Sequence, residues 1–263
     1  AMRKCDSEYL KVPATAAAID VPYFTAPAAG NVLHQNETTI DFSELIETVW
    51  RAPTTPALAK EKIVYMRQLG LQNFAHLIDD VSKPAFYRRP LTETNLWISQ
   101  AGCVSALHFD FLDNLLCQIK GHKTITLYAP AQTAELYPAF ACPEQTDFMV
   151  PPLNFSLVDF NTENFPGAFP LAKVTLPAGV IKVSPGDILY IPPYWWHRVE
   201  TTLGPSISVN FWYAAQYGGP YSSEENAREI AFLNSFRELE SQASPHMVHA
   251  WENCLRALGR NCP

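Results

Sequence analysis

Two histidines and one aspartate are the residues of this sequence whose types and spacing best suit metal chemistry. His108 and Asp110 lie two positions apart, so on a strand or at its end both side chains leave the same face. Far downstream, His197 follows a strand-like run and a stiff aromatic turn, where it can supply a third ligand. Two neutral imidazoles and one carboxylate on one face of an octahedron leave three positions open. This arrangement binds Fe(II), a chelating co-substrate and dioxygen together.

Polar residues around the His-X-Asp motif suit a chelating 2-oxoacid, whose distal carboxylate needs a buried cation and hydroxyl or amide donors. Ser105, Asn114 and Lys123 flank the motif in a predicted strand-turn-strand layout. Lys123 begins a β-prone run that ends at Leu127, and strand alternation directs its ammonium inward. From spacing alone, however, a solvated edge lysine is the simpler interpretation, and a single buried histidine is more often a core residue than a ligand.

The elements that must position these residues are short and β-prone. From Ile63 to Tyr213, such runs alternate with Pro, Gly, Asn and Asp, which predicts a barrel or sandwich core. Three of the runs are Asn95 to Ile98, Thr124 to Tyr128 and Ile188 to Ile191. The stretch from Asn154 to Phe169 is typical of a long loop or insertion between strands.

Helical patterns flank this β-rich part. Apolar residues at helical spacing predict a helix over Phe42 to Trp50, ended by Pro53. After Pro220, Ser222 and Glu225 form a predicted capping box, and the pattern continues into a pair of terminal helices. We therefore divide the chain into an N-terminal accessory segment of residues 1–62, a catalytic core of residues 63–217 and a C-terminal helical region of residues 218–263.

Length, composition, net charge and cysteine spacing exclude some classes of function. A chain of 263 residues with 48% hydrophobic content can bury one substantial core. Its 19 Lys and Arg against 26 Asp and Glu give no overall field that would draw it to phosphate backbones or anionic membranes. The six cysteines are far apart and form no CxxC pair, so we expect reduced thiols rather than a zinc cluster.

We also expect an intracellular protein, cytoplasmic or nuclear. The sequence has no apolar run near the length of about 20 residues that a membrane helix needs, and its beginning lacks the layout of a signal peptide. The opening Ala1-Met2 suggests a truncated chain whose natural form extends further upstream.

Two stretches of the sequence together resemble the JmjC hydroxylase signature, in order and in spacing. The first half comprises His108 to Lys123, Leu127 to Pro130 and Leu136 to Pro138. The second half comprises Gly186 to His197 and Ser208 to Trp212.

This resemblance implies a mainly β fold with some α, a double-stranded β-helix of the cupin or jelly-roll, JmjC type. It also implies a dioxygenase that uses Fe(II), 2-oxoglutarate and O2 to hydroxylate its substrate. The implied iron ligands are His108, Asp110 and His197. The residues implied to hold 2-oxoglutarate or line its pocket are Tyr65, Ser105, Asn114, Lys123 and Asn210.

Within that superfamily the chain is most similar to the tRNA wybutosine-synthesizing hydroxylases and, next, to the asparaginyl hydroxylase of hypoxia-inducible factor. The first is favoured by Asp113 to Leu116, by Tyr65 to Gly70 and by the helical tail. The leading prediction is therefore hydroxylation of a wybutosine-type base of tRNA, followed by hydroxylation of a protein side chain. Clustered basic residues would favour RNA, and the candidates are Arg88, Arg89, Lys120, Lys123 and Arg198.

Other interpretations remain open. A metal-binding cupin shares the barrel and can use the same ligand types, but it would leave the co-substrate residues without a shared purpose. A catalytically silent interaction module predicts a defective triad, and this triad is intact. Lysine demethylation is less favoured, because nothing resembles the reader domains of chromatin demethylases. The helix pair either forms a homodimer, as in related hydroxylases, or covers its own barrel. Four aromatic residues suit either base stacking or, more simply, core packing: Trp97, Tyr194, Trp195 and Trp196.

Overall fold

The structure is a computed structural model. It describes residues 20–26, 36–52, 63–138, 154–156, 158, 170–214, 227–228 and 230–235. The predicted capping box and the second terminal helix lie outside these ranges, as does most of the predicted long loop.

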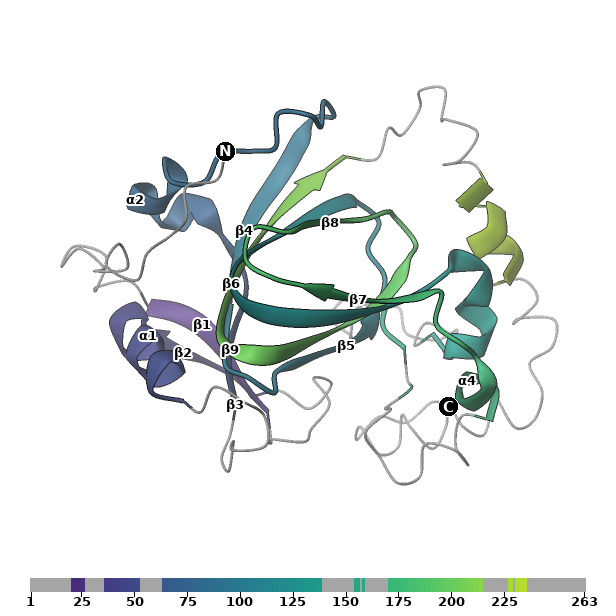
Figure 1. Cartoon of the computed structure of the whole chain (residues 1–263), viewed down its shortest axis with the longest axis horizontal. Helices are drawn as coiled ribbons and strands as arrows, with labels where there is room; N and C mark the ends of the chain where they lie inside the picture. The colour runs from purple at the N-terminus through teal and green to yellow at the C-terminus, as the bar shows by residue number, and fades with distance from the viewer. Residues whose placement is uncertain are drawn as a thin grey trace, which may run out of the picture.

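Nine strands form one strongly curved antiparallel sheet (Figure 1). The strands are β1 (Asp20–Ala26), β2 (Asn36–Asp41), β3 (Ile63–Gly70), β4 (Leu91–Ser99), β5 (Val104–His108), β6 (Asp113–Tyr128), β7 (Gly179–Val183), β8 (Ile188–Ile191) and β9 (Trp196–Tyr213). Their order is β2-β1-β3-β4-β9-β6-β7, while β5 pairs with β9 and β8 pairs with β6. The helical elements are α1 (Phe42–Arg51), η4 (Leu71–Asn73), α2 (Ala75–Ile78), η5 (Pro130–Leu136) and α4 (Pro170–Val174).

The two long strands, β6 and β9, turn this sheet into a barrel. They pair with each other along almost their whole length. The first part of β6 also pairs with β8 and its last part with β7, whereas the first part of β9 pairs with β5 and its last part with β4. Two groups of strands therefore face each other across a common interior (Figure 1). This is the predicted double-stranded β-helix.

Gly121 lies where β6 bends from one group of strands to the other. The register with β9 shifts on both sides of it, and its φ is +72°. A Cβ at this position would lie 2.6 Å from the carbonyl oxygens of both Leu203 and Pro205. Only glycine tolerates both the left-handed backbone and this close approach, so the bend depends on it.

Helix α1 covers the outer face of the sheet. Asp41 caps its first turn by accepting hydrogen bonds from the N–H groups of Ser43 and Glu44, and the chain is extended again at Ala52. The apolar face predicted from the sequence is buried against side chains of β3, β4 and β9. The members of this core include Phe42, Leu45, Val49, Met66, Ile98, Val209 and Phe211.

The chain before β3 is also part of the sheet. β1 pairs with β2 on one side and with β3 on the other, so the segment predicted as accessory extends the barrel's sheet by two strands. The predicted domain boundaries stay a prediction. Within the part of the chain that the structure describes, no helix is long and apolar enough to cross a membrane.

Candidate metal and co-substrate site

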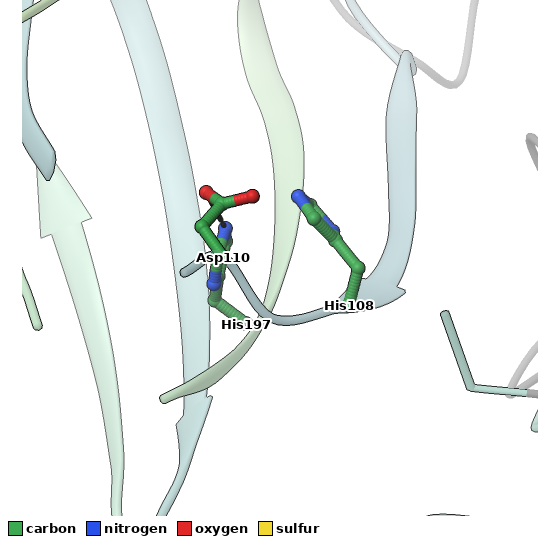
Figure 2. Close-up of side chains that lie close together, drawn as sticks. All are labelled: His108, Asp110 and His197. Carbon is green, nitrogen blue, oxygen red and sulfur yellow. Dashed lines mark ion pairs between the residues drawn. The ribbon is translucent and has the colours of Figure 1, made fainter. Parts of the chain in front are cut away.

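The pairing of β5 with β9 brings the first and third predicted ligands together. His108, the last residue of β5, is the register partner of His197, the second residue of β9. Asp110 follows β5 in the next turn, and its Oδ2 lies 3.6 Å from Nε2 of His197. One ligand atom from each residue lies within 4.8 Å of the others, and Figure 2 shows the three side chains converging.

Both imidazoles are held in the tautomer that a metal requires. The Nδ1–H of His108 donates to the carbonyl of Ala106 at 2.7 Å, and the Nδ1–H of His197 donates to the carbonyl of Trp195 at 3.0 Å. Each Nε2 therefore carries its lone pair toward the centre of the triad. Burial, with the neighbouring His197, lowers the pKa of His108 to about 4, so this ring is neutral at physiological pH.

The short segment Asn154–Ser156 holds the turn that carries the first two ligands. The N–H of Phe109 donates to the carbonyl of Asn154 at 3.0 Å, and the Asn154 side-chain amide donates back to the carbonyl of Phe109 at 2.5 Å. The ring of Phe155 stacks on His108, with centroids 5.0 Å apart and planes 13° apart. Sequence reasoning missed these residues, because no spacing rule links a long loop to the motif it covers.

Lys123 lies inside the barrel, as strand alternation predicted. It is only 4% exposed, and its Nζ donates to the hydroxyl of Ser208 at 2.7 Å. None of the ion pairs among the described residues involves it, and burial lowers its pKa to about 8. A buried cation without a carboxylate partner needs an anion from elsewhere. Ser208 was not predicted, although it shares a strand face with Asn210, two positions later.

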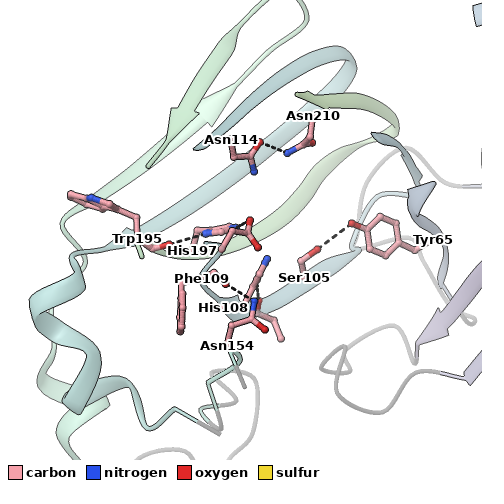
Figure 3. Close-up of polar contacts among 11 residues, drawn as sticks. Tyr65, Ser105, His108, Phe109, Asn114, Asn154, Trp195, His197 and Asn210 are labelled. Carbon is pink, nitrogen blue, oxygen red and sulfur yellow. Dashed lines mark hydrogen bonds and ion pairs between the residues drawn. The ribbon is translucent and has the colours of Figure 1, made fainter. Parts of the chain in front are cut away.

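The other predicted co-substrate residues form two hydrogen-bonded pairs around the triad (Figure 3). The amide of Asn210 donates to Oδ1 of Asn114 at 2.6 Å, and both side chains are buried. The hydroxyls of Tyr65 and Ser105 lie 3.2 Å apart in a second hydrogen bond. Burial raises the pKa of the Tyr65 hydroxyl, which therefore stays protonated and able to donate.

The four aromatic residues considered for base stacking pack against the protein. Trp196 is fully buried, and its indole N–H donates to Thr133 at 2.9 Å. Trp195 packs on the apolar cluster inside the barrel, and Trp97 stacks on Tyr65. Tyr194 packs on the cluster of Leu107, Phe109, Tyr128, Leu136, Trp196 and Phe232. Core packing is thus confirmed for Trp196, whereas the other three pack on the protein and stay partly exposed.

The residues present fit an iron and 2-oxoglutarate. Two neutral imidazoles and a carboxylate are the ligand set of non-haem Fe(II) oxygenases. The buried ammonium of Lys123, which has no carboxylate partner among the described residues, matches the distal carboxylate of the co-substrate. This fold with this site defines the class of Fe(II)- and 2-oxoglutarate-dependent dioxygenases.

The family model described as "Cupin-like domain" matches residues 4–219. Because this match spans most of the chain, the protein belongs to the cupin-like domain family. Curated relatives agree with the JmjC resemblance. Jumonji C domain-containing protein 5 of Drosophila melanogaster is 34% identical over 165 residues, which are 60% of this chain and 38% of that protein. Lysine-specific demethylase 8 of Xenopus tropicalis is 37% identical over 120 residues, which are 46% of this chain and 25% of that protein.

These alignments span less than two fifths of the length of either relative. Among solved structures, YcfD, described as a ribosomal oxygenase from Escherichia coli in complex with cobalt and succinic acid, is 14% identical. The alignment covers 95% of this chain and 62% of that one, with a TM-score of 0.40.

Proposed function

We propose that this chain is an Fe(II)- and 2-oxoglutarate-dependent hydroxylase whose acceptor is a protein side chain. The observation that carries the oxygenase function is Lys123, a buried ammonium without a carboxylate partner among the described residues, inside the same barrel as an intact triad. A metal-binding cupin without a co-substrate would have no use for a charge that costs stability to bury.

The protein's own contribution is positioning. His108, Asp110 and His197 would hold the iron, with the two Nδ1–H groups tied to backbone carbonyls so that neither ring can turn. Lys123 would pair with the distal carboxylate of 2-oxoglutarate and thereby set how deep its keto acid lies. With O2, the bound iron and co-substrate supply the oxidation that hydroxylates a C–H bond and yields succinate and CO2.

The other polar side chains would complete this pocket. Asn114 and Asn210 line the interior on β6 and β9, and their mutual hydrogen bond leaves amide groups for a bound oxyanion. Tyr65 on β3 and Ser105 on β5 supply two further hydroxyl groups (Figure 3). These roles follow the predicted assignments residue by residue.

The basic residues bear on whether the acceptor is a protein or an RNA. Of the five candidates for an RNA contact, Arg89 pairs with the buried Asp113 at 2.5 Å and Arg198 pairs with Glu200. Lys120 lies 6.0 Å from the ring centre of Trp50 in α1, and Lys123 is inside the barrel. The remaining candidate, Arg88, is exposed. This small footprint, in a chain with a net charge of −7, supports a protein acceptor over tRNA.

The name of the Xenopus relative also refers to lysine, a protein side chain, as its substrate. One experiment therefore tests both acceptors predicted from the sequence, the wybutosine-type tRNA base and the asparaginyl side chain.

The experiment measures succinate release by the purified chain with Fe(II), ascorbate and 2-oxoglutarate, in the presence of a peptide library, total tRNA or no acceptor. The inactive control is His108→Ala. His122→Ala is the matched control, because it removes an imidazole whose Nδ1 is bonded to Ser184 rather than directed at the triad.

Stimulation by peptides that persists in His122→Ala and disappears in His108→Ala is the expected result. Stimulation by tRNA alone would replace the protein acceptor with a nucleic acid. If 2-oxoglutarate neither binds nor turns over, the oxygenase function is wrong and a metal-binding cupin remains.

A further inference from the structure

A short C-terminal helical stretch, residues 227–228 and 230–235, lies outside the part of the chain that the family model matches. In Figure 1 it is the yellow-green helix beside η5. Two of its side chains face the barrel. Phe232 is 8% exposed, and the hydroxyl of Ser235 accepts a hydrogen bond from the N–H of Ala134 in η5 at 3.0 Å. The outward positions Ile230 and Leu233 are 55% and 40% exposed.

Phe232 contacts two aromatic residues that lie close to the metal ligands in the chain, Phe109 and Tyr194. Its ring centroid is 4.9 Å from that of Phe109, which lies between the first two ligands in sequence, and 5.1 Å from that of Tyr194. Phe109 is only 1% exposed and also packs edge-on against Trp196, next to the third ligand. Such aromatic contacts have preferred geometries, so each ring restricts the orientation of the ring that it contacts.

Tyr194 connects this packing to the carboxylate ligand through the backbone. Its N–H donates to the carbonyl of Asp110 at 2.9 Å, and its own φ of +66° is in the left-handed region. A non-glycine residue holds this backbone conformation only where its surroundings enforce it. The ring of Phe232 is part of those surroundings.

We propose that Phe232 is a positioning residue for the metal site, which it shapes by fixing Phe109 and Tyr194 and, through them, the backbone of Asp110. This inference rests on the proposed iron site and deepens it. Burial raises the pKa of the Tyr190 hydroxyl in β8 to about 12, and the positive charge of Arg228, in the same stretch as Phe232, opposes this rise.

The test is a Co(II) titration of the purified chain, followed by the ligand-field absorption of the bound ion, at a temperature well below the unfolding midpoint. Phe232→Ala should weaken Co(II) binding about tenfold and change the spectrum, which is the size of effect expected when a group that orients a metal ligand is removed. Phe232→Leu should recover part of the affinity because it refills most of the space. Ile230→Ala, on the exposed face of the same stretch, is the matched control and should bind Co(II) as the unchanged protein does.

A merely structural role would lower the unfolding midpoint of Phe232→Ala and leave its Co(II) affinity and spectrum unchanged, and that result would overturn the proposal. If Phe232→Ala does not fold, Phe232→Leu carries the same comparison, and a native spectrum and affinity in it would count against positioning. A failure of the unchanged protein to bind Co(II) would instead refute the iron site itself, and the proposed function with it.

Discussion

Replacing Lys123 with methionine should make the protein more stable and nearly unable to bind 2-oxoglutarate. Burial lowers the pKa of this lysine from its ordinary 10.5 to about 8. At about 1.4 kcal/mol for each pH unit, the buried charge costs the unliganded fold about 3 kcal/mol. This cost is fully present below pH 8, where Lys123 is charged in both the folded and the unfolded protein. It fades as the pH rises toward 10.5, because the folded protein has then released the proton and no longer buries a charge.

Methionine has nearly the same length without the charge, so Lys123→Met removes this cost. It also leaves the buried hydroxyl of Ser208 without its donor, which costs about 1–2 kcal/mol. The expected net effect at pH 7 is a rise of about 1–2 kcal/mol in the free energy of unfolding, measured by urea denaturation. Loss of the ammonium should weaken 2-oxoglutarate binding by about 3 kcal/mol, or about a hundredfold, because the distal carboxylate is then buried unpaired.

Lys182→Met is the matched control, since Lys182 is an exposed lysine on the adjacent strand β7. It should change neither quantity. Calorimetric titration with 2-oxoglutarate gives the affinity directly. The reasoning is refuted if Lys123→Met binds 2-oxoglutarate as tightly as the unchanged protein. A loss of stability in that variant would show that the charge is compensated inside the fold.

Three further predictions concern the same barrel. Binding of 2-oxoglutarate should weaken as the pH rises above 8 and should take up protons there, because the bound carboxylate raises the pKa of Lys123 again. Calorimetric titrations in buffers of different ionisation heat measure this proton uptake. Its absence would exclude Lys123 as the partner of the carboxylate. Tyr65→Phe keeps the stacking on Trp97 but removes the hydroxyl that bonds Ser105. It should weaken 2-oxoglutarate binding several-fold, at a stability cost of about 1 kcal/mol, and an unchanged affinity would remove Tyr65 from the pocket. Asp113→Asn breaks a pair between a fully buried carboxylate and the partly exposed Arg89, so urea unfolding should show a loss of about 2–3 kcal/mol. A loss below about 0.5 kcal/mol would mean that the pair acts like an exposed one.

The sequence predicted the parts of the site that depend on local spacing. The spacing of two between His108 and Asp110 predicted that both side chains reach one site, although Asp110 already lies in the turn after β5. Strand alternation predicted the inward direction of Lys123, although spacing alone favoured a solvated lysine there. The helix at Phe42–Arg51 was predictable for the same reason, since its apolar period is continuous along the chain.

The remaining features depend on contacts between distant segments. Phe155 stacks on a ligand 47 positions earlier (155 minus 108), and Phe232 packs on a ring more than a hundred positions earlier. No periodicity encodes either contact. Counting charges suggested Arg89 as an RNA contact, but a count does not reveal the buried Asp113 with which it pairs. The strands β1 and β2 lie in a stretch rich in Ala, Pro and Thr, and pairing with β3, rather than a strong local preference, places them in the sheet.

The continuity of strands β6 and β9 limits which insertions and deletions such a protein can accept during evolution. A single continuous strand supplies His197 near its start and both Ser208 and Asn210 near its end, and β6 beside it supplies Asn114 and Lys123. An insertion or deletion inside either strand would shift iron and co-substrate residues relative to each other, because side-chain direction reverses with every residue. Changes in chain length are therefore expected in the segments between strands rather than inside β6 or β9, where they would displace the oxidising centre.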